Sequence, residues 1–355
     1  MDEEAGVLVV DVGSGMCKAG LAHEATPRAV FRSVVGRSKN TTGGTAQTST
    51  YVGDAAISAA DKLNISNPIQ RGVVTNGDDM ETLWQHIFAD ELRTSADEHA
   101  VVLCKAMLTT DADRQRMGQM MFEKFNARAV YFIVKPVLSL YASGRTDGCV
   151  VQSGDGVTHT VPSPTVSFYL SSILLERGYR FTSAADLEAV RDMKRLAYVA
   201  LNFASEKQRA AQIGASIKKS YALPDGRVIT VGDQRFRCAE PLFSPAVMGA
   251  AGTGIHKAAV DSISACDAGV RKELYRNVVL AGGNTMCGGI AERMVQEMTK
   301  VAPAMTAVKI VLPTERKYSA WVGGATVGSH STFQNMSISK AQYEESGPSC
   351  LLAER

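Results

Sequence analysis

The sequence is poor in the features that mark several large classes of protein. None of its apolar runs approaches the roughly 18 to 20 residues that cross a bilayer, so we expect no membrane-spanning segment. Its seven cysteines are scattered over 355 residues and none lies in a Cys-x-x-Cys pair, which argues against a disulfide framework and a zinc site. The net charge is +2 and no long Lys/Arg run occurs, so we expect no nucleic-acid partner and no membrane partner.

Two common nucleotide-binding motifs are also missing. The chain has no GxxxxGK[ST] motif, which excludes a P-loop, and no GxGxxG followed by a ribose-binding acid. The first residues, MDEEAG, are acidic where a signal peptide would be basic. Together with the scattered cysteines, this start predicts a cytoplasmic protein.

The composition that is present is that of an ordinary globular protein, with 45% hydrophobic and 21% charged residues. The length suits about two domains. Strand-like and helix-like segments alternate, which favours an α/β fold. Residues 129–134 predict a strand, and the helix after it has Pro136 in its first turn and Gly144 past its end.

A capping-box pattern marks a second helix. Ser183 and Asp186 are spaced so that each side chain can bond the other's backbone N–H, which predicts a helix over residues 183–203. Its apolar stripe is predicted to consist of four residues, Leu187, Val190, Leu196 and Val199.

Two short stretches share one pattern. Residues 8–20 read LVVDVGSGMCKAG and residues 149–161 read CVVQSGDGVTHTV, and they align with Asp11 over Gln152. Glycines let successive backbone N–H groups turn inward, and such a nest binds phosphate oxygens. The repeat predicts a clamp on a polyphosphate, although each turn alone is also typical of an ordinary hairpin. A third glycine loop, residues 282–286, follows a predicted strand and suits a base or an anion.

Longer segments resemble a known family. LVVDVGSGMCKAGLA, GVVTNGDDME, SGDGVTHTVP, GGNTM, ERKYSAWVGG and STFQNMSISKAQYEESGPS occur in actin's order, and the resemblance to actin spans the whole chain. It implies the α/β, two-lobed fold that actin shares with hexokinase and the heat-shock ATPases. ATP or ADP with Mg²⁺ or Ca²⁺ would then occupy the cleft between the lobes. The resemblance also implies a cytoskeletal protein that self-associates into filaments and binds actin-binding proteins.

The same resemblance implies the limits of the lobes. The small lobe would comprise residues 1–142 and 319–355, with a mobile outer part at about 33–67. The large lobe would comprise residues 143–318, with an outer part at about 169–250.

The resemblance also implies the residues of a nucleotide site. Asp11 would hold the metal through water. The residues that would contact the phosphates are Gly13, Ser14, Gly15, Met16, Lys18, Asp155, Gly156 and Val157. Those that would lie around the ribose and base are Arg191, Lys194, Gly282, Gly283, Asn284, Met286 and Lys317.

The hydrolytic residues depart from the family pattern. In actin, a glutamine, a carboxylate and a histidine position and activate the attacking water, and the matching positions here are Lys135, Gln152 and His159. A glutamine cannot accept a proton, and Lys135 adds a cation where the family leaves room for water and metal. Its charge would partly replace the metal at the γ-phosphate. We expect slow or absent hydrolysis, unless Lys135 swings away and Asp11 with His159 sustains a weak activity.

A second departure follows HTVP, where only SPTVSF stands in place of about seventeen further residues of the family. Either the segment is truly short, which would weaken base contacts and assembly, or coding sequence was lost. Three functions stay open: a divergent filament-forming actin with impaired ATPase, a non-polymerising actin-like subunit with structural nucleotide, and a phosphotransferase. The missing acid at Gln152 disfavours the last.

Overall fold

The protein is described by a computed structural model over residues 6–39, 49–156, 158–159, 166–181, 183–213, 217–223 and 225–352. It separates into two compact units, residues 1–146 with 318–355 (unit 1) and residues 147–317 (unit 2). Within the described ranges, no helix combines the length and apolar character that a membrane crossing needs. Of the segment SPTVSF that follows HTVP, residues 163–165 lie outside the described residues.

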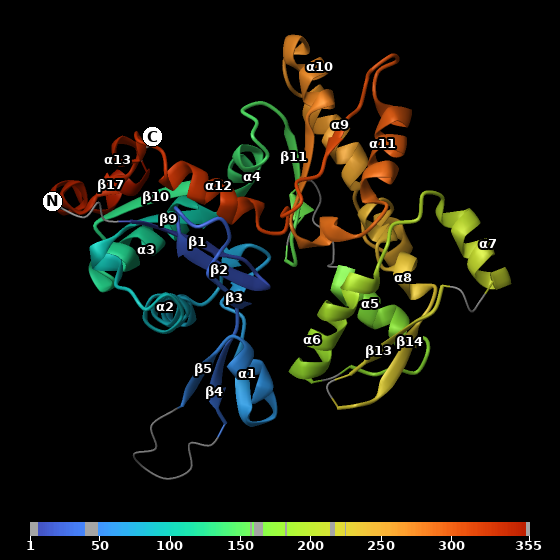
Figure 1. Cartoon of the computed structure of the whole chain (residues 1–355), viewed down its shortest axis with the longest axis horizontal. Coiled ribbons are helices and arrows are strands. Elements are labelled where there is room, and N and C mark those ends of the chain that lie inside the picture. The colour runs from blue at the N-terminus through green and yellow to red at the C-terminus, as the bar shows by residue number, and fades with distance from the viewer. Residues whose placement is uncertain are drawn as a thin grey trace. The chain divides into compact units, whose positions relative to one another are not determined.

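Unit 1 is built on a six-stranded sheet in the order β17-β10-β9-β1-β2-β3 (Figure 1). Its strands are β1 (Val7–Val12), β2 (Met16–Leu21), β3 (Ala29–Arg32), β9 (Ala100–Lys105), β10 (Ala129–Val134) and β17 (Ile338–Ser339). β1, β9 and β10 run parallel to one another, and β2 returns antiparallel to β1. The carboxyl ends of β1, β9 and β10 therefore lie at one edge of the sheet.

Helices cover both faces of this sheet because successive strand residues point to opposite sides. Leu8 and Val10 enter one core, and Val9 enters another. The helices α2 (Gly77–His86) and α3 (Asp111–Gln119) lie over the first face, and α4 (Lys135–Ala142) and α12 (Ser319–Gly328) over the second (Figure 1). Trp84 in α2 and Trp321 in α12 are both fully buried.

The rest of unit 1 consists of short elements. A three-stranded sheet contains β4 (Val35–Ser38), β5 (Thr50–Val52) and β6 (Leu63–Ser66), and a small hairpin contains β7 (Ile69–Gln70) and β8 (Val73–Val74). Within the expected outer part, residues 40–48 lie outside the described residues. The remaining helices and helical turns are α1 (Asp54–Ser58), η1 (Ala60–Lys62), η2 (Ile87–Leu92), η3 (Ala96–Glu98), η4 (Met120–Lys124), α13 (Phe333–Met336), α14 (Lys340–Ser346) and η9 (Gly347–Leu352).

Unit 2 has a four-stranded sheet in the order β12-β11-β15-β16. Its strands are β11 (Cys149–Ser153), β12 (Thr158–His159), β15 (Val278–Ala281) and β16 (Ile310–Val311), with a separate pair β13 (Lys219–Ala222) and β14 (Val228–Val231). Its helices and turns are α5 (Val166–Leu175), α6 (Ala184–Met193), η5 (Lys194–Leu196), α7 (Phe203–Ile213), α8 (Gln234–Arg237), η6 (Glu240–Leu242), η7 (Pro245–Met248), α9 (Ile255–Ser264), α10 (Ala268–Arg276), η8 (Gly283–Met286) and α11 (Ile290–Val301). One core joins the sheet to α9 and α11, which lie side by side (Figure 1).

The predictions that depended on only a few neighbouring residues are confirmed. Residues 129–134 form β10, Pro136 stands in the first turn of α4, and Gly144 past its end has a φ of 69°. The capping box is also confirmed, because Ser183 Oγ accepts from the Asp186 N–H at 3.1 Å and the Ser183 N–H donates to Asp186 at 3.1 Å.

The predicted length of the second helix is wrong. α6 ends at Met193 and the turn after it ends at Leu196, well short of residue 203. The reason lies in the tertiary structure: the Val199 N–H donates to the Gly288 carbonyl at 2.8 Å, so this backbone pairs with a distant loop instead of continuing the helix. Leu187 is 47% exposed and does not belong to the apolar stripe, whereas Val190 is buried.

Candidate functional site

The two glycine turns are the same hairpin used twice. In unit 1, β1 and β2 pair Asp11 with Lys18 across the hairpin. In unit 2, β11 and β12 pair Gln152 with His159 in the equivalent register. Each first strand also runs parallel to a neighbour, β9 for β1 and β15 for β11. The repeat read from the sequence is therefore a repeat of structure, and Lys18 and His159 occupy corresponding positions.

In unit 1, Asp11 stands between two lysines. The Nζ of Lys18 donates to Asp11 Oδ2 at 3.1 Å from the facing position on β2. The Nζ of Lys135 lies 2.7 Å from Asp11 Oδ1, an ion pair without hydrogen-bond geometry. Lys135 reaches Asp11 because β10, which immediately precedes it, ends at the same edge of the sheet as β1. The same ammonium group donates to the Val12 carbonyl at 2.8 Å.

This Asp11 cluster, consisting of Asp11, Lys18 and Lys135, is buried and carries a net positive charge. The side chains of Lys18, Lys135 and Asp11 are only 14%, 12% and 4% exposed. Burial alone would raise the pKa of Asp11, but Lys135 and Lys18 lower it to about 2. Asp11 therefore stays ionised at neutral pH, and one carboxylate faces two ammonium groups.

The Asp11 cluster does not fit a resident divalent cation. Mg²⁺ and Ca²⁺ need oxygen ligands, or oxygens that accept hydrogen bonds from the waters of a hydrated ion. Both carboxylate oxygens of Asp11 and the Val12 carbonyl already face ammonium groups. In the described part of the chain, no group of three or more His, Cys, Asp and Glu side chains could hold a metal ion. The prediction that Asp11 binds metal through water has no support in this arrangement.

The turn beside the Asp11 cluster has the form of an anion-binding loop. The Gly13 N–H closes it by donating to the Met16 carbonyl at 3.0 Å. Ser14 Oγ is fixed because it accepts from the Gly72 N–H at 3.0 Å. Over the described residues, the N–H groups of Ser14 and Gly15 donate to no protein acceptor. Two backbone donors next to a buried lysine form a suitable site for phosphate oxygens.

In unit 2, Asp155 is held by the two cations predicted to lie near the adenosine. Lys194 Nζ lies 3.1 Å from Asp155 Oδ1, and Arg191 Nε lies 3.3 Å from Oδ2. Burial raises the pKa of Asp155, but the opposite effect of Lys194 and Arg191 is larger. The pKa is therefore below its usual value, and the carboxylate stays charged. Arg191 also contacts the buried Glu188, which was not among the residues predicted for the site.

Asn284 links the third glycine loop to the second hairpin. Its Nδ2 donates to the Gly154 carbonyl at 2.7 Å and to Ser153 Oγ at 3.2 Å, and its Oδ1 accepts from Lys194 at 3.4 Å. Asn284 is itself buried. The structure thus brings together the predicted residues Asp155, Lys194 and Asn284 within one hydrogen-bonded network.

The third loop depends on a close backbone approach and on an arginine. Gly282 has a φ of 91°, and a Cβ there would lie 2.3 Å from the Ser153 carbonyl oxygen. The Gly282 N–H donates to the Arg316 carbonyl at 2.9 Å, and Arg316 Nε and Nη2 donate to the Thr285 carbonyl at 3.2 and 3.1 Å. Arg316 was not among the residues predicted for the site. The sequence feature that could have indicated it is its position directly before Lys317 in the ERKYSAWVGG motif.

Other predicted site residues are less enclosed. Lys317 and Gly283 are exposed, and Met286 is 41% exposed at the end of η8. Gly156 is half-buried in the second turn. Two predictions fall outside the described residues, one for Val157 and one for the side chain of His159. Gln152 Oε1 is buried and has no hydrogen-bond partner among the described residues.

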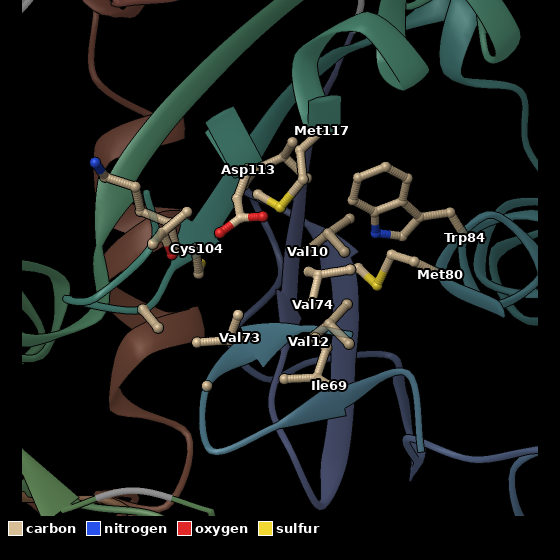
Figure 2. A pocket seen from close by; sticks show the side chains of 15 residues that line it. Val10, Val12, Ile69, Val73, Val74, Met80, Trp84, Cys104, Asp113 and Met117 are labelled. Carbon is tan, nitrogen blue, oxygen red and sulfur yellow. The ribbon is translucent and has the colours of Figure 1, made fainter. Parts of the chain in front are cut away.

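A small cavity lies within unit 1 (Figure 2). It is lined by residues of β1, β9, the β7–β8 hairpin and the helices α2 and α3, among them Val10, Val74, Met80 and Trp84. Its volume of about 30 Å³ is enough for water only. Gly72, whose N–H holds Ser14, lies on its wall. The cavity is thus too small to be a nucleotide pocket.

Comparison with known protein families identifies a match over nearly the whole chain. The family model described as Actin matches residues 2–164 and 169–355, nearly the whole chain. The two matched segments are separated at residues 165–168, within the stretch where the sequence appeared shortened.

Proposed function

Because the chain belongs to the actin family, we propose that it binds ATP or ADP through its two glycine hairpins and hydrolyses ATP slowly or not at all. The observation that carries this proposal is the Asp11 cluster. A lysine ammonium is fixed on Asp11 and on the Val12 carbonyl, where the family resemblance implies a glutamine that positions water. In this proposal the glycine turns retain phosphate binding, and two of the three water-activating residues that the resemblance implies are replaced, by Lys135 and Gln152, while His159 is retained.

The binding half of the proposal rests on two sets of donors. In unit 1, the turn at Gly13–Gly15 adjoins a cluster whose net charge is positive. In unit 2, the second turn is tied through Asn284 and Lys194 to the third glycine loop. The first set is suited to an anionic ligand because it offers backbone donors near fixed cations, and the second because Lys194 and Arg191 stand beside a glycine turn.

The loss of hydrolysis rests on the chemistry of two side chains. Gln152 replaces the carboxylate of the family, and an amide cannot take a proton from the attacking water. Lys135 replaces the glutamine, and its ammonium has no acceptor capacity with which to orient a water as a base would. Loss of a general base typically costs about 10²- to 10⁴-fold in rate.

The experiment is a pair of measurements on one preparation. Binding of a fluorescent ATP analogue tests the site, and single-turnover phosphate release tests the chemistry. We expect binding without appreciable release, and release that rises by at least about tenfold in the double variant Lys135→Gln, Gln152→Asp. Rapid release by the unaltered chain would overturn the slow hydrolysis, and lack of binding would overturn the nucleotide site.

We extend the proposal to assembly and location by family membership. The protein would act in the cytoplasm as a cytoskeletal component that forms filaments and binds actin-binding proteins. Sedimentation with ATP at rising protein concentration tests this extension. Pelleting above a critical concentration supports filament formation, whereas a persistent monomer that retains nucleotide would identify a non-polymerising subunit of a larger assembly.

A further inference from the structure

The Asp11 cluster carries a further inference, which concerns the cation that accompanies the nucleotide. It rests on the proposed nucleotide binding. Each oxygen of Asp11 has an ammonium group within ion-pair distance, Lys135 at 2.7 Å and Lys18 at 3.1 Å. The carboxylate is buried, so water does not screen these charges effectively.

A divalent cation at Asp11 would meet two obstacles. It would have to compete with Lys135 for the same carboxylate oxygen, and it would lie near two positive charges in a poorly hydrated place. With a neutral glutamine at position 135, Asp11 and Lys18 alone would sum to zero charge and leave Oδ1 free. Lys135 is therefore the residue that occupies the carboxylate oxygen a cation would need and adds the charge that repels it.

Lys135 can also neutralise part of the phosphate charge that a cation would otherwise neutralise. Its ammonium group has three donors, and over the described residues one of them is used on the Val12 carbonyl, while the same group forms the ion pair with Asp11. At least one donor therefore remains for a phosphate oxygen. Lys18 uses one donor on Asp11 and keeps two. The Asp11 cluster thus holds a fixed positive charge with unused N–H groups beside the turn at Gly13–Gly15.

We propose that this chain binds its nucleotide without a divalent cation, because the Lys135 ammonium takes the cation's place at Asp11. The charge that neutralises the phosphates is then part of the polypeptide. The nucleotide complex should consequently be indifferent to chelators, in contrast to a site where the metal bridges carboxylate and phosphate.

The test measures the dissociation constant of ATP twice, with excess Mg²⁺ and with excess EDTA. We expect the two values for the unaltered chain to agree within about threefold, less than 1 kcal/mol of binding free energy. In Lys135→Gln we expect binding in EDTA to be at least about tenfold weaker than in Mg²⁺. Lys124→Gln, which removes an exposed lysine elsewhere in unit 1, serves as the matched control and should behave like the unaltered chain.

The outcomes separate this inference from the proposed function. Binding of the unaltered chain that appears only with Mg²⁺ would overturn the inference and leave nucleotide binding intact. Absence of binding in both conditions would overturn the proposed function. If Lys135→Gln also binds equally in EDTA, the role assigned to Lys135 is wrong. The comparison on the unaltered chain needs no variant, so a folding defect in Lys135→Gln does not prevent the test.

Discussion

Replacing Asp11 by Asn tests how strongly the Asp11 cluster contributes to the stability of unit 1. Asn has nearly the shape of Asp but no charge, so it stands in for the protonated carboxyl group. Over the part of the chain that the structure describes, the change leaves Lys18 and Lys135 with no counter-charge within ion-pair distance, and both side chains are less than 15% exposed. The Val12 carbonyl still accepts from Lys135.

The expected loss follows from the pKa of Asp11. A fall from the usual 3.8 to about 2 corresponds to about 2 kcal/mol of folding free energy at pH 7. Breaking one side of a buried pair can cost more, about 3 to 5 kcal/mol, when the stranded charge finds no new partner. We therefore expect Asp11→Asn to lower the free energy of unfolding by at least about 2 kcal/mol.

The pH dependence has a defined sign. Because the pKa of Asp11 is lower in the folded state, its contribution is complete above about pH 4 and disappears as the pH falls through 2. At pH 3 the folded carboxylate is still largely ionised, whereas the unfolded one is largely protonated. The difference between the two proteins should therefore shrink to about 1 kcal/mol at pH 3.

Urea denaturation followed by tryptophan fluorescence is the suitable assay. The two tryptophans of the chain, Trp84 and Trp321, are both buried in unit 1, so their emission reports that unit alone. Asp97→Asn is the control, since Asp97 is an exposed carboxylate of unit 1 with no ion pair over the described residues. If Asp11→Asn is no less stable than Asp97→Asn at pH 7, or if its deficit does not shrink at pH 3, the reasoning fails.

Two further predictions concern the third glycine loop. Gly282→Ala should destabilise unit 2 by at least about 2 kcal/mol, because its φ is positive and the new Cβ would meet the Ser153 carbonyl at 2.3 Å. Gly283→Ala, where nothing lies within 4 Å, should change stability by less than about 1 kcal/mol, and equal effects in thermal denaturation by circular dichroism would contradict the argument. Asn284→Ala leaves the Gly154 carbonyl without its donor and should cost about 1 to 3 kcal/mol by the same assay, with an unchanged tryptophan transition in unit 1. An unchanged unit 2 transition in that variant would contradict a structural role for the network.

Local sequence signals predicted much of the secondary structure. Pro136 and Gly144 marked the two ends of α4 because each fixes the backbone at its own position. Ser183 marked the start of α6 because its cap involves only the next three residues. The same signals could not mark where α6 ends, since that end is set by pairing of Val199 with Gly288.

The repeat of the glycine hairpin was also visible in the sequence alone, because a short turn between two adjacent strands is a short-range pattern. The family resemblance extended this pattern to the site residues by position. It could not reveal Arg316, which holds the third loop through the Thr285 carbonyl, since a carbonyl group carries no sequence signature.

The sequence by itself determined that position 135 is a lysine and position 152 a glutamine, two of the three positions at which the resemblance to actin implies water-activating residues. Only the tertiary structure decided what Lys135 does. The parallel order of β10, β9 and β1 brings the ends of strands more than a hundred residues apart in sequence to one edge, where Lys135 meets Asp11. A buried carboxylate that already faces two ammonium groups has little capacity left for a divalent cation, and that balance of charge arises from packing in three dimensions.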